Sequence, residues 1–137
     1  MIKPYTRGGT RKQTQLRPKR ILIVDDEVRV AYFLQEGLKG LGDDYEVQTT
    51  ESAELALQAI DKESFDLAVI DFRLPGINGL DLIERLQVVS PGTQTILITA
   101  YGSPDIEHAA HRLDTYSYLN KPFRIEDLMC TVEKALS

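Results

Sequence analysis

The sequence predicts an α/β fold in which a five-stranded parallel sheet is covered by helices on both faces. From Lys19 onward, short apolar runs alternate with amphipathic stretches. The runs at residues 21–24, 67–70 and 96–98 are rich in β-branched side chains and show no polar alternation, which is typical of strands buried on both faces. Five strand and helix units in alternation give a doubly wound sheet with right-handed crossovers.

The elements follow one another in regular order. Strands are predicted at residues 21–24, 45–49, 67–70, 96–98 and 116–119, and helices at residues 28–39, 52–62, 80–89, 103–112 and 125–136. Residues 45–49 alternate in polarity, so this strand is placed at an edge of the sheet. Gly40 and Gly42 end the first helix, and Ser103 with Pro104 begins the fourth as N-cap and first helical residue.

Length and composition limit the class of protein. The 137 residues, 42% of them hydrophobic and 27% charged, suit one globular domain that needs no disulfide or structural metal. Cys130 is the single cysteine, which excludes a disulfide pair and a Cys-rich zinc site. No apolar run approaches the roughly 20 residues of a membrane span, and the N-terminus lacks the pattern of a signal peptide. We therefore expect a cytoplasmic protein.

The net charge of −5 conceals an uneven distribution. The first 20 residues carry bases only, namely Lys3, Arg7, Arg11, Lys12, Arg17, Lys19 and Arg20, which leaves nine bases against 21 acids in the rest. Residues 1–18 lack a hydrophobic period and are predicted to form a basic flexible tail, with one domain over residues 19–137. A solvated tail is favoured over a nucleic-acid or membrane contact, because basic runs are weak motifs.

Polar side chains follow the predicted strands at their carboxyl ends, where ligands bind in open sheets of this kind. Asp25, Asp26 and Glu27 follow the first strand, Asp71 the third, Thr99 the fourth and Lys121 the fifth. Carboxylates held about 4 Å apart repel by roughly 4 kcal/mol at an effective dielectric constant of 20, which a divalent cation would cancel. Because the available ligands are oxygens, Mg²⁺ suits the set better than zinc. His108 and His111 have the i, i+3 spacing of a metal-binding pair, but no cysteine or acid pattern accompanies them, and they are assigned to the exposed face of their helix.

Four segments together resemble the response regulator receiver domain, the phosphoacceptor module of two-component signalling. They are ILIVDDE (21–27), VIDFRLPGINGLDLI (69–83), ILITAYGS (96–103) and YLNKPF (118–123). Their order and spacing make the resemblance specific, and it covers residues 19–137. It implies a flavodoxin-like fold with strand order 2-1-3-4-5.

The resemblance also implies residue roles. Asp71 would accept a phosphoryl group from a sensor histidine kinase or a phosphotransfer protein, and Lys121 would contact that group. Mg²⁺ would be held by Asp25, Asp26, Asp71 and the backbone carbonyl of Arg73. The Lys121–Pro122 bond would be cis. Such a module catalyses its own phosphorylation and dephosphorylation without being a metabolic enzyme.

Signalling by a domain of this family requires a switch. By resemblance, Thr99 would move toward the phosphoryl group and Tyr118 would turn inward. The fourth helix, fifth strand and fifth helix would then form the surface for a downstream protein target or for a homodimer. Nucleic acid is not expected as a partner, unless through the basic tail or a missing output domain.

Some positions depart from the family pattern. Asp114-Thr115 replaces the usual Gly-Ala before the fifth strand, so Asp114 must adopt a left-handed conformation. Arg124 stands where a helix cap is frequent. Arg73 and Tyr101 each lie two residues beyond a site residue, and we predict that their long side chains shield the phosphoryl group and prolong its lifetime.

Three other functions are compatible with parts of the pattern. A hydrolase of the haloacid dehalogenase type would need a second acid at the position of Arg73. A nucleotide-binding domain would need a glycine-rich turn where Asp25, Asp26 and Glu27 stand. The remaining alternative is a receiver-like scaffold that binds partners without phosphorylation.

Overall fold

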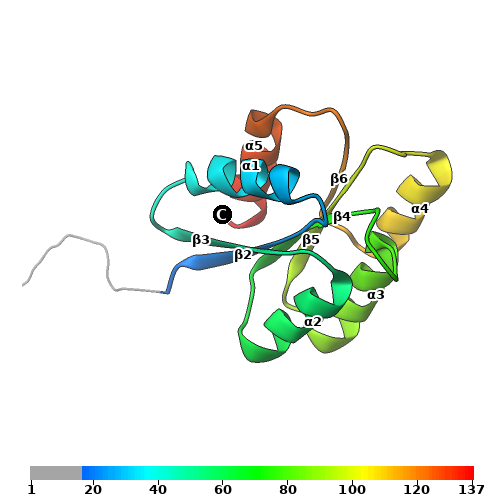
Figure 1. Ribbon diagram of the computed structural model, residues 1–137, viewed down its shortest axis with the longest axis horizontal. Coiled ribbons are helices and arrows are strands. Elements are labelled where there is room, and N and C mark those ends of the chain that lie inside the picture. The colour runs from blue at the N-terminus through cyan, green and yellow to red at the C-terminus, as the bar shows by residue number, and fades with distance from the viewer. Residues whose placement is uncertain (1–16) are drawn as a thin grey trace, which may run out of the picture.

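Five parallel strands form one sheet in the order β3-β2-β4-β5-β6, the predicted 2-1-3-4-5 topology. The structure, a computed structural model, describes residues 17–137 (Figure 1), so the tail predicted over residues 1–18 lies outside the described residues except for Arg17 and Pro18. Arg17 Nη2 lies 3.1 Å from the carboxylate of Asp66, the residue before β4, so Arg17 contacts the domain.

The predicted strands and helices are all present, with bounds that differ by at most two residues from those predicted. The strands are β2 (Lys19–Val24), β3 (Tyr45–Thr50), β4 (Leu67–Asp71), β5 (Gln94–Thr99) and β6 (Ser117–Asn120). The helices are α1 (Val28–Lys39), α2 (Ala53–Lys62), α3 (Gly79–Val89), α4 (Pro104–Arg112) and α5 (Ile125–Ala135). In the described part of the chain, no helix has the length and apolar character to cross a membrane.

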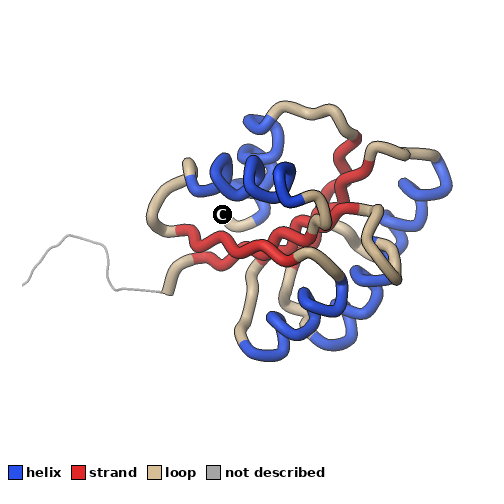
Figure 2. Tube along the Cα trace, viewed as in Figure 1, coloured by secondary structure: helices blue, strands red, loops and turns tan. Residues whose placement is uncertain are grey.

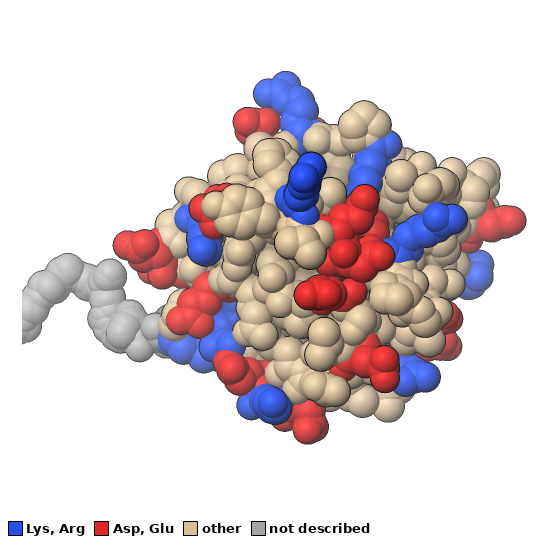
Figure 3. All heavy atoms as spheres, in the orientation of Figure 1, with Lys and Arg blue, Asp and Glu red and all other residues tan. Residues whose placement is uncertain are grey.

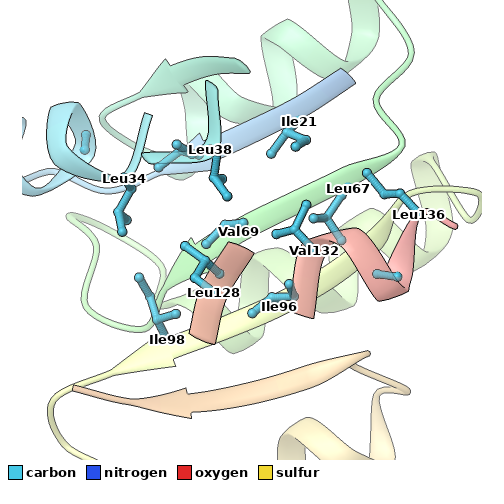
Figure 4. Packing of buried hydrophobic residues seen from close by; sticks show 13 residues of the cluster. Ile21, Leu34, Leu38, Leu67, Val69, Ile96, Ile98, Leu128, Val132 and Leu136 are labelled. Carbon is cyan, nitrogen blue, oxygen red and sulfur yellow. The ribbon is translucent and has the colours of Figure 1, made fainter. Parts of the chain in front are cut away.

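Helices cover both faces of the sheet, α1 and α5 on one and α2, α3 and α4 on the other (Figure 2). Alternate residues of β2 supply the two cores: Ile21 and Ile23 pack toward α1 and α5, while Leu22 and Val24 pack toward the opposite helices. Figure 4 shows the first core, where Leu34 and Leu38 of α1 and Leu128 and Val132 of α5 meet the strands. Burial on both faces explains the continuous apolar runs of the central strands.

The helix ends follow the local sequence. Ser103 accepts a hydrogen bond from the Ile106 N–H and Pro104 is the first helical residue, as predicted. Asp114 has a φ of 55°, so the predicted left-handed turn is confirmed, and the Lys121–Pro122 bond is cis. Arg124 is the N-cap residue of α5. Its backbone N–H donates a hydrogen bond to the Asp127 carboxylate one turn later, which stabilises this helix end.

Candidate functional site

The strand register brings the carboxyl ends of β2, β4, β5 and β6 to one edge of the sheet. Val24 pairs with Ile70 and Ile98 pairs with Asp71, so Asp25 and Asp71 end neighbouring strands. The Lys121 N–H donates to the Thr99 carbonyl over 2.8 Å, which holds the loop after β6 beside the end of β5. The residues predicted to share a crevice are therefore brought together.

Three carboxylates form the floor of the site. Asp25, Asp26 and Asp71 each place a carboxylate oxygen within 4.8 Å of the others. Asp25 is 1% exposed and Asp71 4% exposed, whereas Asp26 is open to solvent. Figure 3 shows acidic side chains gathered in a patch with basic side chains beside it. We refer to Asp25, Asp26 and Asp71 as the acid pocket.

The acid pocket fits a hard divalent cation. Asp25 Oδ1 accepts a hydrogen bond from the Glu27 N–H over 2.9 Å, but Asp25 Oδ2 is buried without a hydrogen-bond partner. A buried carboxylate oxygen without a partner is costly unless a cation or a donor meets it. The donor set consists of oxygens only, which matches the preference of Mg²⁺.

Burial also changes the acidity of the pocket. Desolvation raises the pKa of Asp25 to about 6, and the negative charges of Asp71 and Glu27 raise it further. The hydrogen bond from the Glu27 N–H and the positive charge of Lys121 act in the opposite direction. Desolvation likewise raises the pKa of Asp71, while Lys121 opposes the rise. Burial and mutual repulsion thus make the charged forms of these carboxylates less stable than they are in water. A bound cation would lower that free-energy cost.

Lys121 supplies the positive charge of the site. Its Nζ lies 3.2 Å from Asp71 Oδ1, with the Lys121 side chain 22% exposed and that of Asp71 6% exposed. Since the Asp71 carboxylate is nearly buried, this ion pair is screened less than a surface pair. The arrangement presents a carboxylate oxygen and an ammonium group side by side at the end of β4.

Thr99 and Tyr118 lie on the side of the site toward α4. Thr99 is buried, and its hydroxyl accepts a hydrogen bond from the Tyr101 N–H over 2.9 Å. Tyr118 is partly buried and packs against the core beneath α3 and α4. A Cβ at Gly102 would lie 2.6 Å from the Tyr118 hydroxyl oxygen, so the tyrosine reaches the loop that follows Thr99.

Arg73, two residues after Asp71, and Tyr101, two residues after Thr99, contact each other. The Arg73 guanidinium carbon lies 4.3 Å from the centre of the Tyr101 ring, a cation–π contact between the loops after β4 and β5. The sequence pattern placed each residue near the site but contained no sign of this pairing. His108 and His111 are both exposed on α4, as predicted, and take no part in the site.

Comparison with known proteins identifies the family of this chain. The profile of the response regulator receiver domain matches residues 21–133. This chain belongs to the response regulator receiver domain family. Among curated relatives, it is 30% identical over 118 residues to sporulation initiation phosphotransferase F of Bacillus subtilis, covering 86% of this chain and 94% of the relative.

Other relatives of this receiver domain are longer proteins. It is 32% identical to the transcriptional regulatory protein ZraR of Escherichia coli over 85% of this chain but only 26% of the relative. The chain thus spans about a quarter of that regulator. Among solved structures, response regulator protein TrrA of Thermotoga maritima, in complex with Mg²⁺-BeF, is 32% identical with a TM-score of 0.76, covering 85% of this chain and 98% of that one. The chain is accordingly a receiver domain of two-component signalling.

Proposed function

We propose that this receiver domain accepts a phosphoryl group from a sensor histidine kinase or a phosphotransfer protein onto Asp71, and thereby switches a partner-binding surface. The observation that carries the proposal is the 3.2 Å approach of Lys121 Nζ to a buried Asp71 carboxylate within the acid pocket. Phosphoryl transfer depends mainly on positioning and on neutralising the phosphoryl oxygens, and this site offers both.

The metal ligands are proposed to be Asp25, Asp26, Asp71 and the backbone carbonyl of Arg73. The buried Asp25 oxygen without a partner and the mutual approach of the carboxylates support this set. Mg²⁺ held by these oxygens would offset part of the negative charge of the acid pocket and of a phosphoryl group beside it. Without that neutralisation, the pocket repels the anionic donor.

In the proposed reaction, an Asp71 carboxylate oxygen forms a bond to phosphorus while the bond between phosphorus and the donor's imidazole nitrogen breaks. The electron pair of that bond returns to the imidazole ring. The Lys121 ammonium, now beside Asp71, would contact a phosphoryl oxygen and offset its charge. The product is an aspartyl phosphate.

The switch is proposed to run from Thr99 to Tyr118. A phosphoryl group adds about −1.5 to −2 charge with strong acceptor oxygens, which favours donation by the Thr99 hydroxyl. In the present structure that hydroxyl instead accepts from the Tyr101 N–H, so its movement would release the loop that contacts Tyr118. The surface of α4, β6 and α5 would then change for a downstream protein target or a second copy of the domain.

A donor protein must dock beside the acid pocket. Val28 and Tyr32 of α1 line a small cleft with Asp25, and Val28 is 67%, Tyr32 63% and Phe33 57% exposed. Exposed apolar side chains of this kind typically mark protein interaction sites. We propose α1 as the part of the domain that the donor contacts, in a cytoplasmic setting.

The proposal is tested by intact-protein mass after incubation with Mg²⁺ and acetyl phosphate, with Asp71→Asn as the control. We expect a Mg²⁺-dependent gain of one phosphoryl group that is stable to acid, labile to base and absent from the variant. No gain in a folded protein that binds Mg²⁺, with the cognate kinase also failing to transfer, would favour the alternative of a receiver-like scaffold that works without phosphorylation.

Arg73 and Tyr101 are expected to prolong the life of the aspartyl phosphate. Their stacked side chains join two loops at the site and would obstruct the approach of water to phosphorus. Replacing either with Ala should speed hydrolysis about twofold to tenfold, as expected for losing part of a solvent barrier. The decay of radiolabelled protein measures the lifetime. Unchanged lifetimes in both variants would contradict the shielding role, and Arg85→Ala on α3 is the control.

A further inference from the structure

Lys121 lies between two carboxylates, and one of them is outside the acid pocket. Its Nζ is 3.2 Å from Asp71 Oδ1 and 4.0 Å from Glu27 Oε1. Glu27 directly follows the Asp25-Asp26 pair but is not one of the three clustered carboxylates. The ammonium that is proposed to contact the phosphoryl group is therefore already shared before the group arrives.

The position of Glu27 is not explained by helix capping or by packing. Glu27 is the N-cap of α1, yet its side chain forms no capping hydrogen bond. Its backbone N–H donates to Asp25 Oδ1, and its carbonyl accepts from the Ala31 N–H, so these contacts involve the backbone alone. The side chain is 64% exposed, and among residues 17–137 its ion-pair partner is Lys121. The contact with Lys121 is thus what orients this carboxylate toward the site.

The charge of Glu27 reaches the phosphoacceptor. It contributes to the raised pKa of Asp71 and, to a smaller extent than Asp71 and burial do, to that of Asp25. Glu27 therefore adds a fourth negative charge beside the acid pocket, at a site that must admit an anion. Because the group is largely exposed, solvent weakens the effect without removing it.

We infer that Glu27 is a positioning residue that shares the Lys121 ammonium with Asp71 and competes with the incoming phosphoryl group for it. Glu27 thereby slows the loading of Asp71. This inference rests on the proposed phosphoacceptor function, and it names a residue that sets the rate of that reaction.

The test compares Glu27→Gln with Glu51→Gln in the full chain. Glu51 is also exposed, follows β3 at the same edge of the sheet and lines the cleft beside Asp25, but it has no ion pair with Lys121. We expect Glu27→Gln to raise the second-order rate constant for phosphorylation by acetyl phosphate about threefold to tenfold at low salt, whereas Glu51→Gln changes it less than about twofold.

Two further readouts separate this role from a structural one. Added salt should reduce the increase in phosphorylation rate that Glu27→Gln causes, because the ions screen the charge that the substitution removes. Beryllofluoride, an anionic analogue of the phosphoryl group, should bind Glu27→Gln more tightly than wild type in a calorimetric titration with Mg²⁺ present. Circular dichroism establishes that both variants fold.

The outcomes are distinct. An unchanged or slower rate in Glu27→Gln, an equal gain in Glu51→Gln, or a gain that salt does not reduce would overturn the inference, while phosphorylation of the wild type would leave the proposed function intact. A wild type that accepts neither phosphoryl group nor beryllofluoride would instead contradict the proposed function.

Discussion

Asp25→Asn is expected to stabilise the metal-free domain by about 3 kcal/mol at pH 7.5, the cost of holding this buried carboxylate charged. Burial raises the pKa of Asp25 to about 6, and one of its oxygens has no hydrogen-bond partner. An asparagine keeps an oxygen for the Glu27 N–H and places amide hydrogens where the unpartnered oxygen faces other carboxylates. The substitution therefore removes a repulsive contact without leaving a cavity.

The effect should depend on pH in a defined direction. The folded domain binds the Asp25 proton more tightly than the unfolded chain does, because the pKa rises from 3.8 to about 6 on folding. Stability therefore falls as pH rises between these values and stays lowered above them. The advantage of Asp25→Asn over wild type should be full above about pH 6 and should vanish as pH falls through 4.

Urea denaturation at several pH values, with and without Mg²⁺, measures the free energy of unfolding of the wild type and of Asp25→Asn and so tests this prediction. Mg²⁺ at about a hundred times its dissociation constant should stabilise the wild type by about 2–3 kcal/mol, and it should have little effect on Asp25→Asn. Asp43→Asn, at an exposed position between α1 and β3, is the control. A variant that is less stable than wild type, or that still responds fully to Mg²⁺, would show that Asp25 is not a metal ligand held charged at a cost to stability.

Gly79→Ala is expected to destabilise the domain by about 2–4 kcal/mol, since the added carbon has no room. A Cβ on Gly79, the first residue of α3, would lie 2.6 Å from the Asp71 carbonyl oxygen, 2.9 Å from Phe72 Cα and 3.0 Å from Leu97 Cδ1. Two of these neighbours are backbone atoms, so the whole helix start must move. That movement would displace the phosphoacceptor, and phosphorylation should slow as well.

Gly92→Ala is the matched control for this prediction. A Cβ at Gly92 meets no atom within 4 Å, and its φ lies outside the left-handed region. It should therefore leave the urea midpoint almost unchanged, while Gly79→Ala lowers it clearly. Equal midpoints for the two variants would mean that the start of α3 accommodates a methyl group without cost.

The chain by itself determined the fold class and the edge of the sheet that carries the site. The runs at residues 21–24, 67–70 and 96–98 required strands buried on both faces, and their alternation with helices required a parallel sheet. Because parallel strands end at one edge, the pattern alone was enough to place the polar residues after each run together. The resemblance then supplied the strand order and the residue roles.

The tertiary structure decided which side chains meet at that edge. The stacking of Arg73 on Tyr101, the sharing of Lys121 between Asp71 and Glu27, and the contact of Gly79 with the Asp71 backbone all join segments that are apart in the sequence. Local pattern specifies whether a residue lies in a strand, a helix or a loop. Contacts between loops depend instead on register, on side-chain rotamers and on the space left by neighbouring elements, which exist only once the sheet and its helices have packed.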